Sequence, residues 1–180
     1  MLQRLNNKDF DKVYEVMEES FPMEEYRTYE EQKNLLNNPR YSIYVIKDEN
    51  DHNVMAFICV WRFDQFAFIE HFAVNSKYRN QGLGSSILKE LFQSLSCRIC
   101  LEVELPNTFV AKRRIEFYKR NGFYMNEYPY IQPSISEGRK PLPLAVMTTQ
   151  GGISKALFEE IKKVLYQWVY HVNDIRTPSA

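Results

Sequence analysis

Phe72-Ala-Val-Asn-Ser-Lys-Tyr-Arg-Asn-Gln-Gly-Leu-Gly-Ser-Ser86 is the stretch that decides the fold, because it joins a strand pattern to a helix pattern. Upstream, the residues from Phe66 to Val74 are mostly apolar and aromatic, which predicts a largely buried strand. Downstream, apolar residues recur at helical spacing, namely Ile87, Leu88, Leu91, Phe92 and Leu95. We therefore expect a strand, a polar turn and a helix, with the turn at the start of the helix.

The turn carries two glycines, Gly82 and Gly84, at the point where the helix begins. Glycine adopts positive φ readily, and without a Cβ it lets a ligand approach the main chain. The first N–H groups of a helix have no intrahelical partner and lie at the positive end of its dipole. This combination predicts an anion site that would suit a diphosphate. It is not a P-loop, because no lysine follows Gly84, and Ile87 stands where a dinucleotide fingerprint needs a third glycine.

Composition predicts one globular, cytoplasmic domain. The 180 residues are enough for a sizeable core, and 44% hydrophobic with 14% aromatic residues are values of a folded chain. A formal net charge of zero argues against a nucleic-acid partner bound by bulk electrostatics. No apolar run long enough for a membrane span is present, and the residues after Met1 do not form a signal peptide.

The cysteines do not predict a metal site. Cys97 and Cys100 have the spacing of a metal-ligand pair, but zinc needs two more ligands and no second Cys or His pair stands nearby. We expect them to be reduced structural thiols, with a redox pair as the alternative.

Charge is distributed unevenly along the chain. Acidic residues predominate from Met1 to Glu31, whereas basic residues predominate from Ser76 to Arg120. A basic centre suits a cofactor with several phosphates, and an acidic N-terminal part would suit a cationic acceptor. The alternative is that both are solvated helix faces.

The rest of the chain reads as alternating strands and helices. A capping box at Thr28 and Glu31 marks one helix start. The region 128–143 contains four prolines and is predicted to be an irregular loop. An amphipathic helix is predicted from Ile153 to about His171, beyond a domain of residues 1–150, so that 151–180 would pack on the domain or on a partner subunit. Further strands are predicted at 2–5, 41–47, 54–62, 65–74, 98–105, 123–126 and 144–149, and further helices at 8–21, 28–37 and 109–120.

Two motifs resemble those of the GCN5-related N-acetyltransferases (GNAT superfamily). Arg79-Asn80-Gln81-Gly82-Leu83-Gly84 resembles motif A, Gln/Arg-x-x-Gly-x-Gly/Ala, and Tyr118-Lys-Arg-Asn-Gly122-Phe123 resembles the signature Tyr-x-x-x-Gly-Phe. Both lie in the family's order, about 35 residues apart, which is more specific than either motif alone. The resemblance implies an α/β (α+β) fold: a mixed, mostly antiparallel sheet of six to seven strands, flanked by helices, with an extra C-terminal helix. The strands at 65–74 and 98–105 would be parallel neighbours that splay apart.

The resemblance also implies acetyl-CoA (coenzyme A) as the cofactor. Main-chain N–H groups of the loop would hold its diphosphate, and the main chain near Phe72 would hold the pantetheine arm like an added strand. Asn107 resembles an asparagine that contacts the arm, although its spacing to Tyr118 is about one helical turn longer than the family pattern. The implied cofactor-binding residues are Phe72, Ala73, Val74, Arg79, Asn80, Gln81, Gly82, Leu83, Gly84, Ser85 and Asn107.

Catalysis of amine acylation needs a proton acceptor for the amine and a proton donor for the leaving thiolate. The resemblance places Tyr118 beside the cofactor sulfur as the acid. Glu70 and Glu102 are both candidate bases; we rank Glu70 first, because its apolar surroundings should raise its pKa. Simple strand alternation would put Glu70 and His71 on opposite faces. It predicts one face with Phe66, Phe68, Glu70 and Phe72, and another with Ile69, His71 and Ala73.

The predicted function is acetyl-CoA-dependent N-acetyl transfer to a primary amine of a small molecule. One alternative acceptor is a protein N-terminus or lysine, because Leu101-Glu-Val103 resembles the ribosomal-protein acetyltransferases. An alternative of another class is a non-catalytic acyl-CoA-binding module. We expect a monomer or homodimer, with neither nucleic acid nor membrane as a partner.

Overall fold

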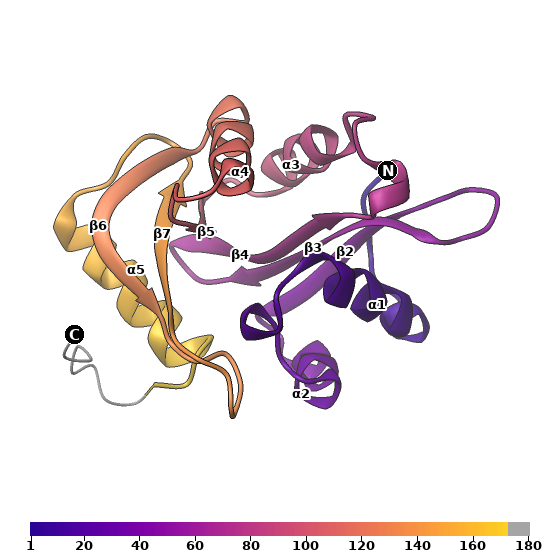
Figure 1. Ribbon diagram of the computed structural model, residues 1–180, viewed down its shortest axis with the longest axis horizontal. Coiled ribbons are helices and arrows are strands. Elements are labelled where there is room, and N and C mark those ends of the chain that lie inside the picture. Colours follow the sequence, from indigo (N-terminus) through magenta and orange to yellow (C-terminus); the bar gives the residue numbers. More distant parts are fainter. Residues whose placement is uncertain (173–180) are drawn as a thin grey trace.

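An open seven-stranded sheet lies at the centre of the computed structural model, which describes residues 1–172 (Figure 1). The strand order is β1-β2-β3-β4-β5-β7-β6, and only β4 and β5 pair in parallel. The mixed, mostly antiparallel sheet confirms the predicted fold class. The strands are β1 Gln3–Arg4, β2 Tyr41–Lys47, β3 Val54–Arg62, β4 Phe66–Val74, β5 Arg98–Glu104, β6 Tyr124–Gln132 and β7 Leu142–Thr148.

Helices cover both faces of the sheet (Figure 1). One core cluster joins α1, the start of α2 and α5 to one face, and a second cluster joins α3 and α4 to the other. Short 3-10 turns accompany them at Asn7–Asp9, Met23–Glu25, Leu35–Asn37 and Ser76–Tyr78. The helices are α1 Phe10–Ser20, α2 Tyr29–Asn34, α3 Leu83–Ser94, α4 Phe109–Arg120 and α5 Lys155–Trp168.

Capping residues explain several helix starts. Thr28 accepts from the N–H of Glu31 while the Glu31 side chain accepts from the N–H of Thr28, which confirms the predicted capping box. Thr108 caps α4 and Ser154 caps α5 in the same Ncap-to-N3 manner. These caps satisfy N–H groups that the first helical turn leaves unpaired.

The predicted loop at 128–143 is wrong in its first part. β6 continues to Gln132, so the irregular segment spans only residues 133–141. The prolines misled the prediction, because Pro129 interrupts an apparent strand. Here it is tolerated, since β6 is an edge strand and the β6–β7 register shifts between Asn126 and Tyr130.

The C-terminal helix packs on the domain itself. Phe158, Ile161 and Leu165 are at most 2% exposed and belong to the same core cluster as α1 and β3. The helix ends at Trp168, and the chain then turns, with the N–H of Val172 donating to the Tyr166 carbonyl. Within residues 1–172, no helix combines the length and apolarity needed to cross a membrane.

Candidate active site

The parallel strands β4 and β5 separate halfway along their length. Their pairing runs from Phe66 opposite Arg98 to Ile69 opposite Leu101 and then stops. This confirms the predicted splayed pair and puts Glu70 and Glu102 at the next position on each strand, where the fork opens. A cleft lies there, lined by Phe21, Glu25, Ile69, Glu70, His71, Phe72, Leu101, Glu102, Val103, Glu104, Arg114, Tyr118, Gln132 and Leu144.

A bulge in β4 changes which way its side chains point. Val60 of β3 lies opposite Ile69, but Cys59 lies opposite His71, so Glu70 is the extra residue. The predicted common face of Phe66, Phe68, Glu70 and Phe72 is therefore wrong. Phe66 and Phe68 belong to the core that includes α1, whereas Phe72 packs with the core that includes α3.

Glu70 is held in a buried ion pair with Arg27. The guanidinium Nη1 lies 2.7 Å from the carboxylate Oε1, and the two side chains are 5% and 2% exposed. Arg27 also donates to the carbonyl of Val169 at 2.9 Å. Burial would raise the pKa of Glu70, but the Arg27 charge and the His71 side chain outweigh it and lower the pKa to about 2. The expected rise is wrong, because the sequence does not show that Arg27 lies beside Glu70.

His71 joins β4 to the loop between α1 and α2. Its Nε2 donates to the carbonyl of Glu25 at 2.7 Å, and its Nδ1 lies 3.5 Å from the Glu70 carboxylate. The expected placement of Glu70 and His71 on opposite faces is thus wrong, and the bulge is the reason. Sequence reasoning assigned His71 no role, because a histidine within an apolar strand gives no local signal.

Glu102 has a different environment. The hydroxyl of Tyr130 donates to its Oε1, and the hydroxyl of Tyr170 donates to its Oε2 at 2.6 Å. Burial raises its pKa to about 7, in spite of these two donors, because no cation is paired with it among the described residues. Glu102 therefore changes its charge near neutral pH, as a general base should.

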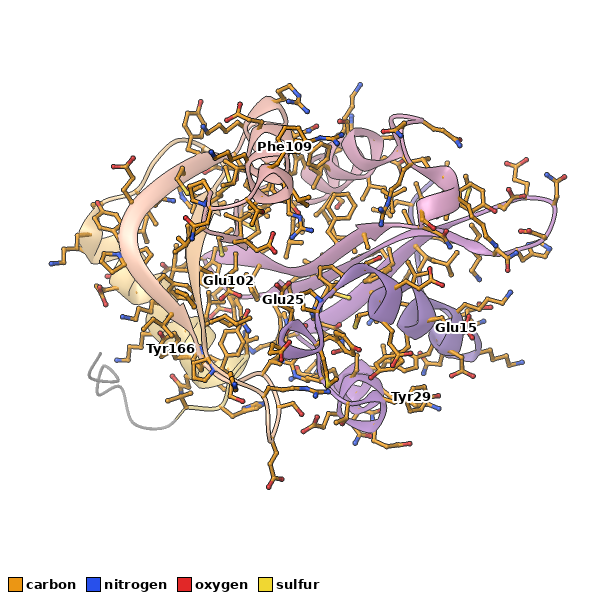
Figure 2. All side chains as sticks on the ribbon, viewed as in Figure 1. Glu15, Glu25, Tyr29, Glu102, Phe109 and Tyr166 are labelled. Atoms are coloured by element: carbon orange, nitrogen blue, oxygen red, sulfur yellow. The ribbon has the colours of Figure 1, made fainter. Side chains whose placement is uncertain are left out.

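The lining of the cleft is acidic. Glu25 and Glu102 both lie near the middle of the molecule, from the α1–α2 loop and from β5 (Figure 2). Burial raises the pKa of Glu25, and the nearby charge of Glu104 raises it further. Glu104 is paired with Arg114 at 2.8 Å. Of the four carboxylates that line the cleft, Glu70 and Glu104 are paired with arginines. Glu25 and Glu102 have no cationic partner among residues 1–172, which favours a cationic ligand.

Tyr118 reaches the same cleft from α4. It is 7% exposed, and burial raises its pKa to about 12. The phenol therefore stays protonated at neutral pH and can donate a proton. The structure thus brings all three predicted catalytic residues, Tyr118, Glu70 and Glu102, to one cleft.

The glycine turn lies at the start of α3, where a Cβ built on Gly84 would be 3.6 Å from Phe72 of the cleft lining. Asn80 and Gly82 both have positive φ, 63° and 76°, and no side chain caps the helix. A Cβ built on Gly82 would meet no atom within 4 Å, whereas one on Gly84 would lie 3.0 Å from the ring of Phe117. Gly82 is thus needed for its backbone conformation, and Gly84 for packing. Arg79, Asn80, Gln81, Gly82 and Ser85 are exposed, and Leu83 and Gly84 are partly buried.

The other predicted cofactor residues differ in position. Phe72 lines the cleft, while Ala73 is 7% exposed and belongs to the core of the opposite face, so only its main chain is available there. Val74 accepts a hydrogen bond from Arg79 Nε at 3.1 Å. Asn107 is exposed in the turn before α4 and is not one of the residues that line the cleft.

The chain belongs to the GNAT acetyltransferase family. The model of the family "Acetyltransferase (GNAT) family" matches residues 8–123, which confirms the resemblance of the two motifs. A GNAT-family protein from Bacteroides thetaiotaomicron is 36% identical, with a TM-score of 0.86, over 96% of this chain and 99% of that chain.

More distant solved structures share the fold. The ribosomal-protein-S18-alanine N-acetyltransferase from Escherichia coli is 21% identical, with a TM-score of 0.59 over 86% of this chain and 95% of its own. An aminoglycoside 6′-N-acetyltransferase in complex with coenzyme A is 16% identical, with a TM-score of 0.60 over 83% of this chain and 96% of its own. A variant of spermidine N-acetyltransferase from Vibrio cholerae is 17% identical, with a TM-score of 0.59 over 83% and 94%. No curated protein gives a significant match.

Proposed function

We propose that this protein is an acetyl-CoA-dependent N-acetyltransferase that acetylates a primary amine of a small cationic molecule by direct attack. The observation that carries the proposal is the fork between β4 and β5, where Glu102 and Tyr118 line one acidic cleft beside an uncapped helix start. Family membership supports the reaction class. Neighbours named for spermidine and aminoglycoside acetylation support a small amine as acceptor.

The residues present fit coenzyme A. The first N–H groups of α3 are uncapped, and open space surrounds the position that a side chain at Gly82 would fill. The main chain of β4 beyond Ile69 is released from β5, so its edge can hold an extended arm in the manner of an added strand. Acetyl-CoA, when bound, supplies the thioester carbonyl that an amine attacks.

Glu102 is our candidate for the general base. A primary amine is mostly protonated at neutral pH and attacks only as the free base. A carboxylate whose pKa is about 7 can take that proton directly or through a water molecule. Glu70 is less suited to this role, because Arg27 keeps it ionised and occupies one of its oxygens. Its role on this account is structural: through Arg27, Glu70 holds the α1–α2 loop against β4.

Tyr118 is our candidate for the general acid. Its phenol lines the cleft and stays protonated at neutral pH, so that it can give a proton from Oη to an anion that develops there.

The acceptor is cationic on this account, because its site is acidic. Glu25 lies in the cleft with no hydrogen-bond or ion-pair partner for its carboxylate among residues 1–172. An ammonium group beside Glu25 would relieve its repulsion from Glu104. A neutral acceptor would leave that repulsion in place.

Calorimetric titration with acetyl-CoA tests the cofactor site. Gly82→Trp fills the open space at the start of α3, so we expect it to abolish micromolar binding. Gly138→Trp is a matched control, because Gly138 also has positive φ (77° against 76°) and open surroundings but lies in the β6–β7 loop. Equal binding by wild type and both variants would refute the proposal that this loop holds the diphosphate of acetyl-CoA.

An acceptor panel separates the candidate functions. Polyamines, aminoglycosides, neutral amines, amino acids and peptides are offered with acetyl-CoA, and free thiol release is measured. Turnover that favours cationic small amines supports the proposal. Preference for peptides would instead favour protein acetylation, and tight cofactor binding without turnover on any amine would favour a binding module.

A further inference from the structure

The C-terminal segment contacts Glu102 of the cleft lining, although it lies outside the part of the chain that matches the family model. That match ends at residue 123, whereas α5 begins at Lys155. α5 lies beside β6 and β7, the two strands that follow β5 at one edge of the sheet (Figure 1). The helix ends at Trp168, and the chain then turns. The N–H groups of Val169 and Tyr170 donate to the carbonyl of Leu165, which fixes this turn.

The two residues of this turn contact the Arg27–Glu70 ion pair and the Glu102 carboxylate. The carbonyl of Val169 accepts from Arg27, the partner of Glu70, at 2.9 Å. The hydroxyl of Tyr170 donates to Glu102 at 2.6 Å. Val169 is 1% exposed and Tyr170 is 7% exposed, so neither contact is at the surface.

Glu102 is held at both of its oxygens by donors from different elements. Tyr130 on β6 bonds Oε1, and Tyr170 after α5 bonds Oε2. Two donors on opposite oxygens prevent the carboxylate from rotating, so its remaining lone pairs keep fixed directions. Burial keeps the pKa of each tyrosine well above its usual value, so both hydroxyls stay protonated and act as donors.

We propose that Tyr170 is a positioning residue that, together with Tyr130, clamps the Glu102 carboxylate in the orientation in which it accepts the amine proton. The turn that follows α5 then supports the catalytic centre. This inference rests on the role of Glu102 in the proposed function.

Other groups near Glu102 would remain when the Tyr170 hydroxyl is removed. Glu70 and His71 face it from β4, and Tyr166 contributes from α5. Tyr166 itself donates to the carbonyl of Ile131. The effect of Tyr170→Phe is therefore the loss of one donor to the carboxylate, with the charged surroundings unchanged.

The pH dependence of kcat/KM for the amine tests the clamp. A hydrogen-bond donor stabilises the ionised form of Glu102. Without the Tyr170 hydroxyl, the acid limb of the pH–rate profile should therefore move upward by about one pH unit in Tyr170→Phe. At pH 6 this is roughly a tenfold loss, whereas the plateau above pH 9 and the KM for acetyl-CoA should change little. Tyr128→Phe is the control, because it removes a tyrosine-to-backbone bond to Ile153, at 3.0 Å, without touching Glu102.

The outcomes are distinguishable from failure of the proposed function. An acid limb in Tyr170→Phe that coincides with that of Tyr128→Phe would overturn the clamp while leaving acetyl transfer intact. If the wild-type protein acetylates no amine, the proposed function fails. The clamp is then tested by itself, by an NMR titration that follows the carboxyl carbon of Glu102. An upward shift of its midpoint in Tyr170→Phe, absent in Tyr128→Phe, supports the contact, and equal midpoints refute it.

Discussion

Replacing Arg27 with methionine should destabilise the fold, because it leaves the buried carboxylate of Glu70 without a cation. Methionine keeps much of the side-chain length but removes the charge, so Glu70 stays 2% exposed without its cation, and the carbonyl of Val169 loses its donor. Breaking one partner of a buried ion pair destabilises by about 3–5 kcal/mol. We expect a loss of that size at pH 7, measured as the free energy of unfolding in urea.

The pH dependence of this loss has a definite sign. In wild type the pKa of Glu70 is lowered to about 2, so its stabilising contribution is present above its ordinary value of 4.5 and is lost as the pH falls through about 2. Without Arg27, burial dominates and the pKa rises above the ordinary value. The variant then gains stability on acidification, and its deficit should be smaller at pH 5 than at pH 7.

Glu70→Gln in the Arg27→Met background is the control. It removes the uncompensated charge, and we expect it to restore most of the lost stability. A deficit for Arg27→Met below about 1 kcal/mol, typical of an exposed pair, would refute the reasoning. A deficit equal at pH 5 and pH 7, with no recovery in the double variant, would refute it too.

Three further predictions follow from the same site. Tyr118→Phe should lower kcat about 100-fold or more with little change in the affinity for acetyl-CoA, and unchanged turnover would remove Tyr118 from the mechanism. In wild type, kcat/KM for the amine should rise with pH through about 7, because Glu102 accepts a proton only when it is ionised; a pH-independent value between 5 and 8 would contradict this. Gly84→Ala places a Cβ 3.0 Å from the ring of Phe117, so thermal denaturation should show a loss of about 1–3 kcal/mol, and full stability would mean that the ring moves freely.

Much of the fold could be predicted because its signals are local. The turn from Arg79 to Gly84 and the signature at Tyr118 are short motifs, and their order identified the family. The strand and helix patterns around them gave most elements within a few residues. Such signals depend on residues near one another in sequence, so they can be read without the tertiary structure.

The parts that could not be predicted depend on distant contacts or on a change of register. The β4 bulge at Glu70 reverses side-chain alternation, and no residue type in that strand indicates it. Arg27 is separated from Glu70 by 43 positions, and Tyr170 from Glu102 by 68. Arg27 and His71 lower the pKa of Glu70, whereas burial raises that of Glu102 in spite of its tyrosine donors. Ranking Glu70 above Glu102 from its apolar neighbours therefore had the wrong basis.

The most direct test of the account is the initial rate of acetyl transfer to a cationic small amine by wild type and by Glu102→Gln. Glutamine keeps the shape of the side chain but cannot accept a proton at pH 8. The account predicts measurable turnover by wild type, a loss of at least about 100-fold in Glu102→Gln at pH 8, and unchanged affinity for acetyl-CoA. Equal rates for the two proteins would contradict the central claim that Glu102, at the fork of β4 and β5, is the base.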